Sequence, residues 1–312
     1  MIKYLKQSEI DYEKWDSCIA NSSNSYIYAF SWYLDIVAQD WDAIIEGDYE
    51  YVFPLPFRKK FGISYIYQPT LTQQLGVFSN KKIDSKRVLK FIQAIPNKFK
   101  LTEINLNKFN HLEENKDFNI INNTNIELDI SRDYESLWSG YSKNLKRNIK
   151  KGIKNNLSIG RSSKPEDVIS LFSNNKGTEI NAFSKDEYRI ILQLMYMLIN
   201  KGFAEVYSVF SEHNNLLAGI FILNDKARRI LIFSGLNTEG KEKGAMPFLI
   251  NSFIKENINK NLIFDFEGSN NPTLARFFKS FGSNEFHYQS LRYYQFSAMG
   301  KIALKLAGKK IN

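Results

Sequence analysis

The segment from Arg229 to Gly282 limits the possible folds more than any other part of the chain. Two short apolar runs, RILIFSGLN (229–237) and LIFDFEGSN (262–270), are each followed by an amphipathic run. Short runs rich in β-branched and aromatic residues predict buried strands, whereas Phe248, Phe253 and Ile254 recur near the helical period. The order is therefore strand, helix, strand, helix. Two successive strands joined by a helix are expected to lie parallel and adjacent in one sheet.

The link between the first strand and its helix is rich in glycine and lysine (TEGKEKGAM, 238–246). A glycine just before a helix start exposes backbone N–H groups and the positive helix end, which together favour an anion. We therefore expect a phosphate-binding loop formed by Lys241, Lys243, Gly244 and Ala245. The alternative is an ordinary turn with solvated lysines.

Bulk composition narrows the class of protein. The chain has 312 residues, a formal net charge of +9 and a single cysteine, Cys18. One cysteine excludes an intramolecular disulfide and a cysteine-based metal site, which fits a reducing compartment. The positive charge favours an anionic partner such as a phosphorylated cofactor, a nucleic acid or an anionic lipid.

The sequence does not predict a membrane-spanning helix. The first 15 residues carry charge throughout, and no apolar run approaches the ~20 residues that a spanning helix needs. We expect a soluble, cytoplasmic protein. Residues 297–312 form a short basic amphipathic pattern, so we expect at most peripheral membrane contact there.

The order of predicted elements repeats along the chain. Residues 1–130 read as a strand, two helices, a three-strand meander, a helix and two strands, and residues 131–312 repeat this outline. No residue-level repeat accompanies this order. The sequence thus predicts two domains, 1–130 and 131–312, each an α/β unit with a mixed sheet.

Three motifs carry a family resemblance: YIYQPTLTQQLG (65–76), the basic run YSKNLKRNIKKGIKNN (141–156), and FDFEGS (264–269) followed by RFFKSFG (276–282). Together with the tandem layout, they resemble the GNAT acyltransferase fold in duplicate, as in the FemAB-like and BioF2-like acetyltransferase group. The resemblance implies an α/β fold of two GNAT-like domains. It also implies acyl transfer from acyl-CoA to an amine, an acyl-donor site in the second domain, and a degenerate first domain that holds the acceptor.

Catalytic candidates follow the second strand of the opening segment. Strand alternation puts Asp265 and Glu267 on one face, near the level where the parallel strands of this fold separate. A partly buried carboxylate there can take a proton from an attacking amine, and we expect Glu267 to be the base. Backbone amides at Ser234 and Leu236 would contact the acyl carbonyl, and Asn270 lies at the start of the next helix. The alternative role for both carboxylates is ion pairing or helix capping.

The basic run predicts an amphipathic helix. Leu145, Ile149 and Ile153 form an apolar stripe, while Lys143, Arg147, Lys150 and Lys154 form a positive one. We expect Arg147 and Lys150 to bind substrate phosphates or a tRNA backbone, and the resemblance puts an Arg/Asn pair at Arg147 and Asn148. A solvated surface is the alternative. Few aromatic residues accompany the cations, so DNA is not an expected partner.

A run of uncharged hydrogen-bonding groups lies in the first half. Such groups suit sugars, peptides or amides better than phosphates. The acceptor-binding candidates are Tyr67, Gln68, Thr72, Gln73 and Gln74. Tyrosine and threonine are also good strand formers, so a purely structural role is the alternative.

Two further functions stay open at this point. One is a FemAB-type transferase that uses aminoacyl-tRNA and a peptidoglycan precursor, although the second half lacks a long coiled-coil arm. The other is a non-catalytic binding protein of the same fold. His111, His213 and His287 have no metal-binding spacing, so no metal is expected.

Overall fold

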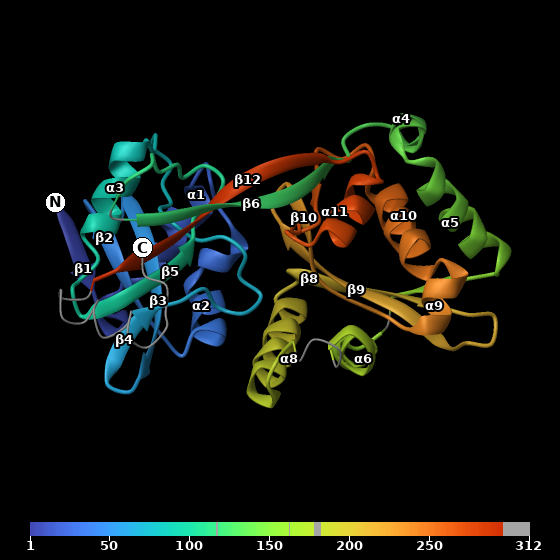
Figure 1. The fold of residues 1–312 in the computed structure, drawn as a ribbon, viewed down its shortest axis with the longest axis horizontal. Helices are drawn as coiled ribbons and strands as arrows, with labels where there is room; N and C mark the ends of the chain where they lie inside the picture. Colours follow the sequence, from blue (N-terminus) through green and yellow to red (C-terminus); the bar gives the residue numbers. More distant parts are fainter. Residues whose placement is uncertain (117, 162, 178–181, 296–312) are drawn as a thin grey trace. The chain divides into compact units, whose positions relative to one another are not determined.

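The computed structural model describes residues 1–295 apart from 117, 162 and 178–181 (Figure 1). The amphipathic pattern predicted at 297–312 lies outside the described residues. The chain forms two compact units. Unit 1 contains residues 1–123 and the chain from His287 onward, and unit 2 contains Thr124–Phe286. The sequence predicted a boundary between residues 130 and 131, with all of 131–312 in one domain. In the structure, most of the last strand, from His287, belongs to unit 1.

Unit 1 follows the predicted order of elements. Its helices are α1 (Tyr12–Asn21), α2 (Ser31–Val37) and α3 (Ser85–Gln93), with short 3-10 turns at Gln7–Glu9 and Ile27–Ala29. Its strands are β1 (Ile2–Leu5), β2 (Asp40–Glu46), β3 (Tyr51–Lys60), β4 (Ile63–Ile66) and β5 (Phe99–Asn105). Asp11 caps α1, since its side chain accepts a hydrogen bond from Lys14 N.

Unit 2 begins within β6 (Phe118–Asp129) and ends within β12 (Asn284–Tyr294). Its other strands are β7 (Ser158–Gly160), β8 (Ala204–Phe210), β9 (Leu216–Asp225), β10 (Arg228–Leu236) and β11 (Ile263–Asp265). Its helices are α4 (Tyr134–Gly140), α5 (Lys143–Lys154), α6 (Pro165–Phe172), which continues into a π-turn (Ser173–Gly177), α8 (Lys185–Asn200), α9 (Thr238–Lys243), α10 (Ala245–Asn257) and α11 (Pro272–Lys279).

In the described part of the chain, the strands form one twelve-stranded sheet, whose two six-strand halves have matching topologies. In unit 1 the order is β1-β2-β3-β4-β5-β12, and in unit 2 it is β7-β8-β9-β10-β11-β6. The first four strands of each are antiparallel, the fourth and fifth are parallel (β4 with β5, β10 with β11), and the sixth is antiparallel again. Each six-strand half is completed by a strand from the other part of the sequence, because β12 pairs with β5 and β6 pairs with β11.

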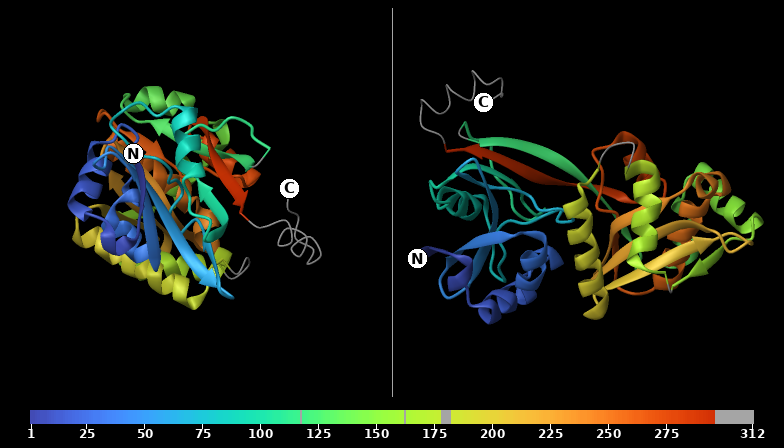
Figure 2. Two further views of the ribbon diagram at one scale, coloured as in Figure 1. Left: turned by 90° about the vertical axis from the view of Figure 1, so that its left-hand side faces the viewer. Right: turned by 90° about the horizontal axis from the view of Figure 1, so that it is seen from below.

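Helices cover both faces of the unit 2 sheet (Figure 1 and Figure 2). On one face α6 lies so close that a Cβ on Gly235 would be 2.5 Å from Val168 O. On the other face α10 packs into the core through Leu249, Ile250 and Phe253, and α5 joins that core with Leu145 and Ile149. The missing side chain at Gly235 thus permits the close approach of α6.

Two irregular breaks interrupt the elements. Strand β4 ends at Ile66, and the chain continues irregularly, held by isolated bridges at Leu75 and Phe78. The helical stretch from Tyr134 onward is broken at Tyr141, where α4 ends and Ser142 caps α5 by accepting from Leu145 N. The second break coincides with the side-chain cap at Ser142, which starts a new helix.

Among the residues that the structure describes, no helix combines the length and apolar character needed to cross a bilayer.

Candidate active site

Strands β10 and β11 separate after only three residue pairs. They pair in parallel at Arg228 with Ile263, Arg229 with Phe264 and Ile230 with Asp265. There β11 ends, while β10 continues to Leu236 and shifts register against β9 between Leu231 and Phe233. A bulge of this kind bends a strand and increases its twist. Pairing between the two strands therefore ends in the middle of the sheet of unit 2, at the level where the family resemblance led us to expect a separation.

The far end of β10 turns backbone groups toward this separation. Asn237 N donates to Leu217 O on β9 at 3.1 Å. Backbone groups alternate in direction along an antiparallel strand, so those of Leu236 and Ser234 point away from β9. These are the two positions that the sequence suggested for contact with an acyl carbonyl, and that role stays a prediction.

Asp265 ends β11 in a fully buried position. It is 1% exposed and lies directly opposite Glu127 of β6, which is 5% exposed. Burial, and after it the nearby Glu127 carboxylate, raise the pKa of Asp265 to about 6. Hydrogen bonds from Glu267 N and Asn125 and the charge of Arg228 act in the opposite direction. Asp265 is thus held in a polar cluster closed to solvent.

Sequence reasoning did not identify Glu127, Asn125 or Arg228 as part of this cluster. Glu127 lies between two apolar residues, Ile126 and Leu128, in a strand pattern. This was the sequence signal that could have indicated a functional role for Glu127. Period-2 alternation alone does not say that the charged face is buried, because that depends on which strand lies opposite. Only the β6–β11 register brings Glu127 beside Asp265.

Glu267 lies beyond the strand rather than on it. Its φ is +54°, in the left-handed region, and its N–H donates to Asp265 Oδ1 at 2.8 Å. The expected alternation of Asp265 and Glu267 along one strand is therefore wrong. Gly268 follows with φ +49°, and a Cβ there would lie 2.3 Å from Thr124 O. The turn fixes Glu267 in a half-buried position next to the end of β11.

Asn270 binds within the chain. Its Oδ1 accepts from Thr124 N at 3.1 Å, so it anchors the turn to β6. Asn271, not Asn270, is the cap of α11 and accepts from Thr273 N and Leu274 N. Asn270 as a donor-binding residue stays a prediction, and the observed contact gives it a structural role.

The predicted phosphate loop is helical. Residues Thr238–Lys243 form α9, and Gly244, at φ +75°, ends α9 and immediately starts α10. The Gly244 N–H donates to the carbonyls of Gly240 and Lys241. A Cβ on Gly244 would lie 2.5 Å from Asn148 O of α5, and one on Gly240 would lie 2.5 Å from Leu217 O. Both glycines thus serve close packing, and the Gly244 amide is already used as a donor within the chain.

The side chains around this junction fit a diphosphate poorly. Lys243 pairs with Glu239 at 2.8 Å, and this hydrogen bond raises the pKa of Lys243. Ala245 is completely buried and Met246 is 9% exposed, so the start of α10 is covered. Lys241 is exposed. The expected loop is thus a short helix, and donor binding by Lys241, Lys243, Gly244 and Ala245 stays a prediction.

Helix α5 presents a dense positive surface. Its twelve residues include six lysines and arginines and no acid, and no ion pair between described residues involves any of the six. Arg147 and Lys150 are accessible to solvent, and Arg147 Nη2 donates to Asn144 Oδ1 at 2.6 Å. The predicted apolar stripe is wrong at Ile153, which is 61% exposed. Gly152 takes its place in the packing, where a Cβ would lie 2.7 Å from Phe248 Cβ.

In unit 1, the predicted acceptor-binding run is largely engaged by internal hydrogen bonds. Gln68 donates to Thr72 O at 2.5 Å and accepts from Asn105 N at 2.8 Å. Gln74 is completely buried and donates to Gln73 Oε1, while the Tyr67 ring stacks under the Arg58 guanidinium at 4.2 Å. These groups hold the loop against β5, and acceptor binding by the run stays a prediction.

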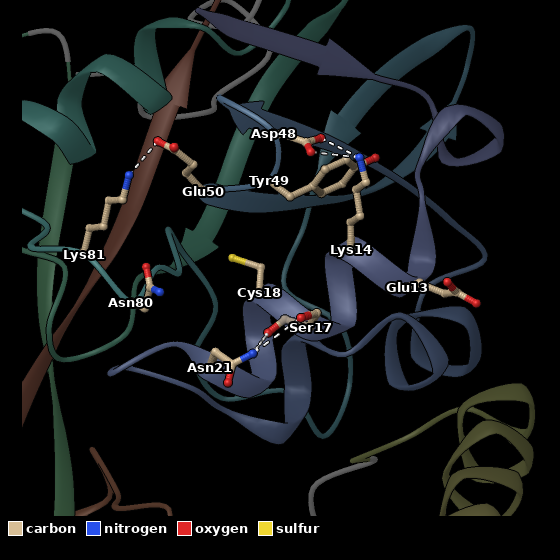
Figure 3. Close-up of a pocket in the computed structure, with 10 residues that line it drawn as sticks. All are labelled: Glu13, Lys14, Ser17, Cys18, Asn21, Asp48, Tyr49, Glu50, Asn80 and Lys81. Atoms are coloured by element: carbon tan, nitrogen blue, oxygen red, sulfur yellow. Dashed lines mark hydrogen bonds and ion pairs between the residues drawn. The ribbon is translucent and has the colours of Figure 1, made fainter.

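A surface depression of about 470 Å³ lies elsewhere in unit 1 (Figure 3). Its lysines are already paired, Lys14 with Asp48 at 2.8 Å and Lys81 with Glu50 at 2.9 Å. Cys18 lies among them, and burial raises the pKa of its thiol to about 11. A protonated thiol and neutralised charges give this depression little reactivity. Within the described ranges, no group of three or more histidine, cysteine, aspartate or glutamate side chains has a metal-binding arrangement.

No family model and no curated protein sequence matches this chain. Solved structures do match its fold. FemX aligns over 98% of this chain and all of its own, with a TM-score of 0.63 and 12% identity. The C-terminal domain of a putative lysylphosphatidylglycerol synthetase from Agrobacterium fabrum aligns over 96% of both chains, with a TM-score of 0.54 and 11% identity. A tandem GNAT protein from the clavulanic acid biosynthesis pathway covers 96% of this chain and all of its own, with a TM-score of 0.51 and 9% identity.

These likenesses concern the fold, since the identities are low. The matches extend over nearly the whole chain, and both units repeat the same six-strand topology with one parallel pair. The chain therefore has the tandem GNAT-like, FemAB-like fold that its sequence motifs resemble.

Proposed function

We propose that unit 2 is an acyltransferase that moves an acyl group from an activated donor, such as acyl-CoA, to an amine. The observation that carries this proposal is the separation of β10 from β11, with a carboxylate at the end of β11. A flat acyl group fits between separated strands, where it meets backbone donors on one side and a proton acceptor on the other.

The chemical step needs no covalent enzyme intermediate. The amine nitrogen attacks the acyl carbonyl carbon, the bond to the leaving sulfur or oxygen breaks, and the proton of the amine passes to the Glu267 carboxylate. Backbone N–H groups of Ser234 and Leu236 would donate to the carbonyl oxygen as it gains negative charge. The Asp265 carboxylate acts as a positioning group, because it holds the Glu267 N–H at 2.8 Å.

The phosphates of the donor are assigned to α5 instead of the α9–α10 junction. The Gly244 amide is used within the chain, whereas Arg147 and Lys150 are accessible on a helix without acidic residues. An extended polyanion is the ligand that such a helix attracts most strongly. This supports aminoacyl-tRNA as a second candidate donor, with a peptidoglycan precursor or another cell-wall amine as acceptor.

Ligand-dependent thermal stability separates the candidate donors. Stabilisation by CoA or acetyl-CoA supports the first donor, and stabilisation by tRNA supports the second, while stabilisation by a UDP-linked muropeptide supports the acceptor that accompanies tRNA. If none of these compounds raises Tm, the alternative is a non-catalytic binding protein of this fold, and the proposed reaction fails.

Replacement of Glu267 by glutamine tests the proton acceptor. With an amine acceptor in hand, Glu267→Gln is expected to lower kcat about 100-fold or more and to leave KM nearly unchanged. The acidic limb of the pH–rate profile should disappear with it. The control is Glu114→Gln, at an exposed glutamate of unit 1. Unchanged turnover and an unchanged pH profile in Glu267→Gln would exclude Glu267 as the base.

A further inference from the structure

The β3–β4 hairpin of unit 1 ends in an apolar tip that is open to solvent. Phe61 is 92% exposed and Ile63 is 43% exposed. They lie immediately after three consecutive cations, Arg58, Lys59 and Lys60. An exposed phenylalanine and isoleucine this close together form an apolar patch that the folded chain does not bury.

Phe61 occupies a position that the turn itself disfavours. The hairpin closes through Phe61 and Gly62, with φ of +51° and +77°. Two-residue turns with both residues in the left-handed region strongly favour Asn-Gly or Gly-Gly, and a bulky side chain there is strained. The Phe61 ring meets the Lys60 ammonium, which lies 5.6 Å from the ring centroid. The residue therefore serves neither the turn nor the core.

The cations surround this tip on both faces of the hairpin. Lys60 lies opposite Ile63, Lys59 opposite Ser64 and Arg58 opposite Tyr65, so Lys59 projects on one face and the other two on the opposite face. Among the ion pairs formed by described residues, none includes these three side chains. The Arg58 guanidinium stacks on Tyr67, which leaves its charge in place. The tip therefore combines two exposed apolar side chains with three neighbouring positive charges.

We propose that this hairpin tip docks on the surface of an anionic lipid bilayer. Phe61 and Ile63 enter the interfacial layer, and Arg58, Lys59 and Lys60 contact lipid phosphates with their flexible stems extended along the acyl boundary. A bilayer fits better than a nucleic acid because Ile63 adds apolar area beside the Phe61 ring but no second planar ring on which a base stacks. The net charge of +9 draws the whole chain to the same surface. This inference does not depend on the proposed acyl transfer.

Phe61→Asn in the full-length protein provides the test, because asparagine suits the left-handed turn and removes the ring. In co-sedimentation with phosphatidylglycerol/phosphatidylcholine vesicles, we expect this variant to bind about tenfold more weakly than the wild type. Its thermal stability should equal or exceed that of the wild type, which excludes misfolding as the cause. Lys59→Glu with Lys60→Glu should weaken binding further, and high salt should reduce the remaining binding.

Phe109→Asn is the matched control. Phe109 is 49% exposed in the same unit, and the Lys108 ammonium lies 5.5 Å from its ring centroid. The proposal expects this control to bind vesicles like the wild type. Equal vesicle binding by Phe61→Asn and wild type would overturn it and point to another contact region, such as residues 297–312. It is also overturned if the wild type ignores anionic vesicles, or if Phe61→Asn loses binding to single-stranded RNA but not to vesicles.

Discussion

Asp265 carries an ionisable group in a place that solvent does not reach. Glu127 lies directly opposite Asp265 on β6 and is also a carboxylate. The Glu267 N–H and Asn125 hydrogen-bond to Asp265. Burial and the like charge outweigh these bonds and favour the protonated carboxyl, so its pKa rises from 3.8 to about 6. At neutral pH Asp265 is therefore ionised, and its buried charge lowers the stability of the folded protein. This charge lies beside Glu267, the proposed base.

The pH dependence of stability follows from this raised pKa. Unfolded Asp265 loses its proton near 4 and folded Asp265 near 6, so the free energy of unfolding should fall as pH rises through this window, by on the order of 3 kcal/mol. Asp265→Asn keeps an oxygen acceptor for Glu267 N–H and should remove this fall. Urea denaturation at several pH values measures it. Asp186→Asn, at an 86% exposed side chain, should retain the wild-type slope, and equal slopes in all three proteins would contradict the assignment.

Helices α9 and α10 meet at Gly244, and the packing of α5 against this residue explains its role. Gly244 needs a left-handed backbone, and α5 also approaches it too closely for a side chain. From the sequence, the same glycine predicts an anion-binding loop, since both uses require the same residue at the same place before a helix. The neighbouring helix decides between them, and here α5 covers the junction.

Gly244→Ala tests this element. Gly202 has the same φ of +75°, but a Cβ added there would meet nothing within 4 Å, so Gly202→Ala measures the backbone strain alone. We expect Gly202→Ala to lower the free energy of unfolding by about 1 kcal/mol, and Gly244→Ala by a further ~1–3 kcal/mol because of the contact with Asn148 O. Chemical denaturation compares the two. Equal losses would mean that α5 moves away without cost.

Over the whole molecule, the two halves of the sequence exchange their last strands. Strand β5 pairs with β12 through Asn105 and Ser290, among other pairs, and β11 pairs with β6. A cut between residues 130 and 131 therefore separates β12 from β5 and β6 from β11, and it leaves β5 and β11 each with an unpaired edge. Such an edge offers a row of free backbone groups to other chains.

Expression of residues 1–130 alone should show this dependence. Without β12, strand β5 becomes an exposed edge, so we expect aggregation or loss of cooperative unfolding, measured by light scattering and thermal melts. A fusion that adds residues 284–312 after residue 130 through a glycine/serine linker should recover solubility and a cooperative transition. A soluble, cooperatively folded fragment 1–130 would show that β12 is dispensable for unit 1.

The sequence by itself determined the kinds and order of elements. Alternation and helical spacing between near neighbours predicted the β10-α10-β11-α11 order and the duplicated layout, because such patterns are local. The tertiary structure decided which strand lies opposite Asp265, which glycine amide is already used, and which half of the chain completes each sheet. These depend on contacts between residues far apart in sequence, such as Glu127 with Asp265 and Asn148 with Gly244, and no local pattern contains them.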